Sequence, residues 1–69
     1  MKLKKLLKVM ETERYVVYTE SLNDDQDWEK WTRGQIKNSK SFMKTYGSNK
    51  VEEINSERGW IQIYVTWRK

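Results

Sequence analysis

The side chains that most often carry catalysis near neutral pH are missing, because the sequence has no histidine and no cysteine. Nucleophilic and general-base chemistry draws mainly on those two residue types. Structural zinc sites use them as well. We therefore expect a protein that is not an enzyme and that needs no metal ion or other cofactor.

An acidic cluster, Asp24, Asp25 and Asp27, is the remaining candidate for acid–base or metal chemistry. With Asn23 it repeats oxygen ligands at every second residue, as calcium loops do, but it lacks the glycine and the bidentate glutamate that such a loop needs. Asn and Asp side chains also bond their own backbone in turns. We interpret the cluster as part of a turn over residues 21–27.

Aromatic residues are the most unusual feature, since nine of the 69 residues are Trp, Tyr or Phe. Trp and Tyr are frequent hot spots at protein interfaces, and they also stack on nucleobases. A domain this small also needs large side chains to fill its core, and we expect about half of the aromatics to serve there. The candidates for partner binding are Trp60, Tyr64, Tyr15, Tyr18, Trp28 and Trp31.

Charge alternates in blocks along the chain, and the net charge is +4. Residues 30–50 hold six basic residues and no acidic one, with aromatic residues among them. Basic and aromatic interleaving is typical of single-stranded nucleic-acid sites, but a solvated helix face also explains the lysines. The candidates for a nucleic-acid site are Lys30, Arg33, Lys37, Lys40, Lys44 and Tyr46, beside Trp31.

The N-terminal residues predict a short amphipathic helix. Leu3, Leu6, Leu7 and Met10 follow the i, i+3, i+4, i+7 spacing, with lysines between them. Such a stripe fits a membrane surface or a partner helix, and it also fits a core helix, which we favour. Lysines interrupt the apolar residues, so we expect neither a signal peptide nor a membrane span.

Two strands and a turn follow in the prediction. Residues 14–19 are rich in β-branched and aromatic residues, which suit a strand. Residues 28–36 are ambiguous between helix and strand, because Trp28 and Trp31 fit a helix stripe while Trp, Thr and Gly34 also suit a strand. We predict a strand there, paired with residues 14–19.

The second half of the chain predicts a short helix and a hairpin. Ser39 or Ser41 can cap a helix around residues 42–46, and Gly47 stands where a left-handed C-terminal residue is favoured. Residues 51–55 and 60–67 predict two strands joined by a turn at 56–59. In the last strand, Ile61, Ile63 and Val65 alternate with polar and aromatic residues, so we expect Trp60 and Tyr64 on the opposite face.

These elements predict one α+β domain over residues 1–69: a small antiparallel sheet of three to four strands with two short helices packed on one face, in the order α-β-β-α-β-β. A chain of this size buries only a modest core. Without disulfides or zinc, self-association is the remaining source of stability, so we expect a homodimer. The absence of cysteine also fits a reducing, cytoplasmic location.

Five segments form a pattern similar to short phage and prophage open reading frames of low-GC Gram-positive bacteria: residues 1–9, 16–18, 31–34, 51–54 and 61–65. The resemblance implies a phage or mobile-element accessory protein in a bacterial host cell. It also implies binding to a host protein, and anti-CRISPR-like inhibitors of bacterial defence systems are one group of such proteins. Our first hypothesis is therefore host-protein binding through an aromatic sheet face, and the alternative is single-stranded nucleic-acid binding by residues 30–50.

Overall fold

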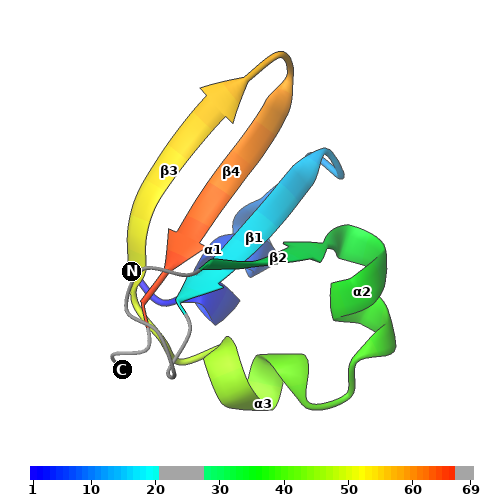
Figure 1. Ribbon diagram of the computed structural model, residues 1–69, viewed down its shortest axis with the longest axis vertical. Coiled ribbons are helices and arrows are strands. Elements are labelled where there is room, and N and C mark those ends of the chain that lie inside the picture. The colour runs from blue at the N-terminus through cyan, green and yellow to red at the C-terminus, as the bar shows by residue number, and fades with distance from the viewer. Residues whose placement is uncertain (21–27, 67–69) are drawn as a thin grey trace.

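The computed structural model describes residues 1–20 and 28–66 and confirms a small α+β fold (Figure 1). Within these ranges, one mixed sheet of four strands carries three short helices, so the prediction of two helices in the order α-β-β-α-β-β missed α2, which forms where a strand was predicted. In chain order the elements are α1 (Leu3–Val9), β1 (Tyr15–Glu20), β2 (Trp28–Thr32), α2 (Arg33–Asn38), α3 (Phe42–Tyr46), β3 (Val51–Glu57) and β4 (Trp60–Val65).

The sheet has the strand order β2-β1-β4-β3, and its centre is parallel. The pairs β1–β2 and β3–β4 are antiparallel as predicted, but β1 runs parallel to β4. The prediction of an antiparallel sheet was therefore wrong at the central pair. The physical reason for this error is that alternation within a strand specifies which side chains face the core. It does not specify whether two neighbouring strand pairs meet in parallel or antiparallel orientation.

The helices give the sheet one covered face, and Figure 1 shows α1 behind the strands β1 and β4. Almost every element contributes to one apolar core, with β2 and β3 adding partly buried side chains at its edge. The buried hydrophobic cluster consists of Leu3, Val17, Ile36, Phe42, Ile63 and Val65.

The N-terminal helix packs on its own domain. Leu3 is fully buried, and the other members of the predicted stripe, Leu6, Leu7 and Met10, pack against the same core. The favoured interpretation of a core helix is thus confirmed. Among the described residues, no helix is long and apolar enough to cross a bilayer.

The ambiguous segment divides into a strand and a helix at Thr32. The predicted strand ends there and α2 begins at Arg33, so the strand prediction was wrong for residues 33–36. Thr32 forms a capping box: its Oγ1 accepts from the Gln35 backbone N–H at 3.3 Å, and its own N–H donates to Gln35 Oε1 at 2.8 Å. Reciprocal bonds of this kind start a helix by satisfying its first donors.

Gly47 is needed for close approach rather than for left-handed backbone. Its φ of −59° and ψ of −31° are ordinary helical values, so the predicted left-handed conformation was wrong. A Cβ at this position would collide with the carbonyl group of Met43. The Gly47 carbonyl also accepts from the Lys4 backbone N–H at 2.8 Å, which ties the start of α1 to the end of α3.

Candidate functional site

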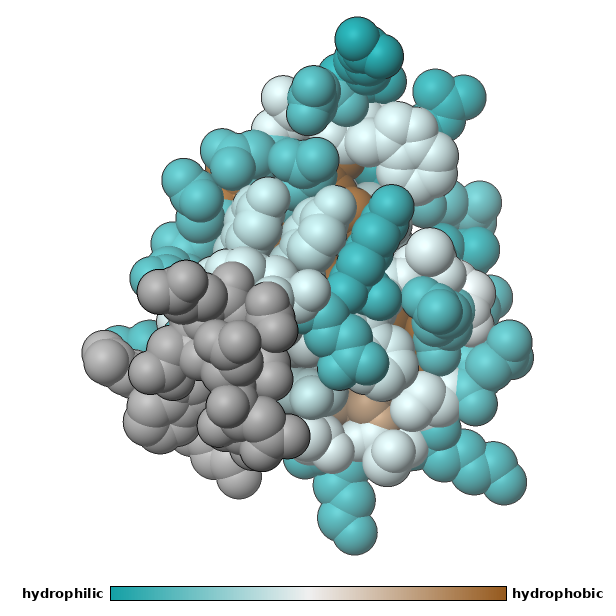
Figure 2. Space-filling view, in the orientation of Figure 1, coloured by the Kyte–Doolittle hydropathy of each residue, from teal (hydrophilic) through white to brown (hydrophobic). Residues whose placement is uncertain are grey.

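The face of the sheet without helices, called the open face below, carries the alternate side chains of each strand. On β4, Ile63 and Val65 point to the core, while Trp60 and Tyr64 lie on the open face, as predicted. Trp60 remains 46% exposed. Figure 2 shows pale side chains across the middle of this face, surrounded by hydrophilic ones.

An aromatic cluster, Tyr18, Trp28 and Tyr64, occupies one end of the open face. Tyr18 and Tyr64 are cross-strand neighbours on β1 and β4, and their rings stack with centroids 4.9 Å apart and planes 12° apart. Trp28 meets the Tyr64 ring edge-on at 5.3 Å and 89°. Both arrangements are favourable for aromatic pairs, so the three side chains hold one another in place while Trp28 stays exposed.

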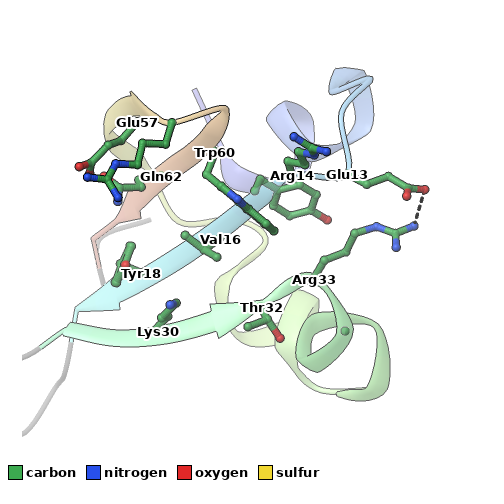
Figure 3. A pocket seen from close by; sticks show the side chains of 13 residues that line it. Glu13, Arg14, Val16, Tyr18, Lys30, Thr32, Arg33, Glu57, Trp60 and Gln62 are labelled. Carbon is green, nitrogen blue, oxygen red and sulfur yellow. Dashed lines mark hydrogen bonds and ion pairs between the residues drawn. The ribbon is translucent and has the colours of Figure 1, made fainter.

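A groove, called the Trp60 groove below, lies at the other end of the open face, where β1 and β4 begin and β2 ends (Figure 3). Its volume is about 730 Å³. Trp60 supplies most of its exposed apolar surface, whereas Val16 borders the groove but is only 9% exposed. Four basic residues line it, Arg14, Lys30, Arg33 and Arg58, together with the two acidic residues Glu13 and Glu57.

Local structure explains why three arginines converge on this groove. Arg14 directly precedes β1, and Arg33 is the first residue of α2. Arg58 and Gly59 form the two-residue turn between β3 and β4, and both have positive φ (51° and 81°), the backbone of a type I′ turn. Glycine accepts that conformation freely, whereas Arg58 occupies it as an L residue.

Charge is divided along the open face. The Trp60 groove has a basic excess, and one of its carboxylates, Glu13, already pairs with Arg33 at 3.1 Å. That pair is solvent-exposed and contributes little stability, about 0–1 kcal/mol. Near the aromatic cluster, a shallow hollow is lined by Glu52 and Glu53 beside Trp28 and Tyr64. The face therefore offers a basic groove at one end and an acidic, aromatic surface at the other.

Two of the predicted partner-binding residues lie on the helix side. Tyr15 is partly buried against the core, although it also borders the Trp60 groove, so of the two tyrosines on β1 only Tyr18 belongs to the open face. Trp31 packs against Phe42, with ring centroids 4.9 Å apart, and its Nε1 donates to the Thr19 hydroxyl at 3.0 Å. The expectation that Trp31 presents a binding surface was wrong, because β2 turns this side chain inward.

The predicted nucleic-acid block does not form one surface. Lys30 and Arg33 line the Trp60 groove, whereas Lys37, Lys40 and Lys44 are exposed on α2, α3 and the segment between them. The aromatic residues of this block lie apart from these basic residues, because Tyr46 packs with Trp31 and Phe42 on the helix-covered side of the sheet. The hypothesis that residues 30–50 interleave bases and aromatics on one face was therefore wrong.

The acidic cluster around Asp24 to Asp27, and Trp67 at the end of the last predicted strand, lie outside the described residues. Within residues 1–20 and 28–66, no group of three or more His, Asp or Glu side chains is placed to hold a metal ion.

Sequence reasoning missed Arg14, Arg58 and Val16. Val16 follows from the same alternation that selects Tyr18, since the two residues share a face of β1. Arg58 lies within the predicted turn at 56–59, directly before the last strand, so the sequence indicates that it lies close to Trp60. The position of β1 beside β4, which brings Arg14 near Trp60, had no sequence signal.

No protein-family model, curated protein or solved structure matches this chain.

Proposed function

We propose that this chain is a non-enzymatic accessory protein that binds another protein through its open face. One observation carries the proposal: Trp60, Trp28 and the stacked tyrosines lie together on a sheet face that no described helix covers. Trp and Tyr bury large areas with little loss of rotamer entropy, which makes them frequent hot spots of protein interfaces. The phage-like pattern of the sequence supports a bacterial host protein, such as a defence component, as the partner.

The arrangement of the aromatic cluster favours a protein over a nucleic acid. Tyr18 and Tyr64 each use one ring face to stack on the other, so no base can insert between them. Carboxylates such as Glu53, which is paired with Tyr64 across β3 and β4, lie on the same end of the face. They repel phosphates, whereas a protein surface can present lysine or arginine to them.

Capture of a partner from host lysate, followed by binding of the purified partner, tests the proposal. A Trp60→Ala/Tyr64→Ala chain is expected to lose at least about tenfold in affinity, the size of a hot-spot contribution. A matched control, Val9→Ala/Met43→Ala, also truncates two exposed apolar side chains but lies off the open face. Capture that is unchanged in the first variant, or lost equally in both, would contradict the proposal.

The second candidate function is single-stranded nucleic-acid binding, favoured by the arginines and Lys30 beside the exposed Trp60 ring. Phosphate contacts make affinity fall steeply as salt rises. Titration of a labelled oligonucleotide at increasing salt measures this, and an absence of binding at low salt eliminates the candidate.

We also propose that the chain forms a homodimer, because its buried apolar cluster is small. Sedimentation velocity across protein concentration tests this. A dimer is expected, with a melting temperature that rises with concentration; a monomer at every concentration contradicts it.

A further inference from the structure

The Trp60 groove combines an apolar surface with a basic rim, and this combination restricts what can fill it. Figure 3 shows Trp60 reaching over the sheet beside Val16, with Arg14 and Arg33 toward one end and Lys30 across the strands. An occupant must offer an apolar group to the exposed Trp60 ring. It must also offer negative charge at the rim.

The basic residues of the rim are open to a ligand. Arg33 already pairs with Glu13, but among the described residues Arg14, Lys30 and Arg58 form no ion pair. All three are exposed. Guanidinium groups bind carboxylates with two parallel hydrogen bonds, which gives geometric specificity as well as attraction.

We propose that the Trp60 groove binds an acidic, extended segment of the partner protein; this inference rests on the proposed function. An apolar side chain of such a segment packs on the exposed Trp60 ring. Carboxylates on the neighbouring residues of the segment extend sideways to Arg14, Lys30 and Arg58 at the rim.

Charge complementarity and the limits of the groove favour such a peptide over a nucleic acid strand. A strand that continues along the open face leaves the basic end and meets the carboxylates of Glu52 and Glu53. Phosphates recur at every nucleotide, so the strand cannot avoid them. A short acidic segment ends within the groove.

Fluorescence anisotropy with defined probes tests the inference. The probes are labelled hexapeptides with a central Leu, Phe or Trp flanked by Asp or Glu, and a labelled six-nucleotide oligothymidine. The test variant is Arg14→Gln/Lys30→Gln/Arg58→Gln. The matched control, Lys37→Gln/Lys40→Gln/Lys44→Gln, removes the same charge from α2, α3 and the segment between them. Circular dichroism confirms that both variants fold.

At least one peptide is expected to bind, with a dissociation constant that rises at least about tenfold in the groove variant and changes less than about twofold in the control. With these probes, three results overturn the inference: no peptide binds at millimolar concentration, both variants weaken binding equally, or oligothymidine binds more tightly than every peptide and depends on the groove residues. If the groove variant captures the partner normally while Trp60→Ala/Tyr64→Ala does not, the acidic segment is refuted and the proposed function stands.

Discussion

On the helix-covered face of the sheet, Trp31 and Phe42 place their rings 4.9 Å apart, and on the open face Tyr18 and Tyr64 do the same. The surroundings differ. Phe42 is 1% exposed and lies in the core beneath the helices, whereas the tyrosines share their surface with Trp28 and Trp60, which are exposed. The ring pair on the covered face therefore stabilises the core, whereas the pair on the open face belongs to an aromatic surface that a partner can contact.

The largest expected difference between the faces is in the cost of truncation. Phe42→Ala is expected to lower the free energy of unfolding by about 3–5 kcal/mol, because it opens a cavity in a fully buried site. Tyr64→Ala on the open face is expected to cost about 1 kcal/mol, mainly through the lost ring contacts. Urea denaturation followed by circular dichroism measures both. Equal losses would remove the distinction between the faces.

A smaller effect is expected from the hydrogen bond beneath the sheet. Trp31→Phe keeps an aromatic ring but removes the donor to Thr19, which is 1% exposed, and is expected to cost about 1–3 kcal/mol. The same change at the exposed Trp28 is expected to cost less than about 0.5 kcal/mol.

Thr19→Val supplies the control for that bond. In this background the hydroxyl is already gone, so Trp31→Phe is expected to cost less than it does in the original chain. An unchanged cost would show that the tryptophan contributes by packing alone. Thermal unfolding of the four chains measures the difference.

The smallest effect is expected within the aromatic cluster. A double-mutant cycle of Tyr18→Ala and Tyr64→Ala is expected to give a coupling energy of about 0.5–1.5 kcal/mol, the range found for stacked aromatic pairs. A cycle of Tyr18→Ala with Thr45→Ala, an exposed residue on α3, is expected to give none. A coupling near zero in the first cycle would mean that the stacked rings are not held together in solution.

The sequence predicted most reliably whether a strand side chain faces the core or the solvent. The alternation in β4 correctly placed Ile63 inside and Tyr64 outside, because a period of two leaves only two faces. It worked less well at residues 28–36, where helix and strand propensities competed. There the capping box at Thr32 ended the strand and began a helix.

The candidate site was only partly predictable for a related reason. The sequence predicts Trp60, Tyr64, Tyr18 and Trp28 as candidates for partner binding, and the structure places them on the open face. Trp31 was assigned to the same surface, but its position in β2 aligns it with Val17, whose side chain is fully buried. Trp28 and Trp31 are three residues apart, so alternation within β2 already separates them onto opposite faces. The register with β1 decided that Trp31 is the one that points inward.

By itself, the sequence determined a small α+β domain with an amphipathic first helix, a final strand of two unlike faces and no cysteine or histidine chemistry. Those properties follow from local periodicity and composition. Only the tertiary structure set β1 parallel to β4, and that pairing aligns Tyr18 with Tyr64 and brings Arg14 to the groove beside Trp60. Contacts between distant segments depend on how whole elements pack, so the sequence alone could not predict which residues meet at the candidate site.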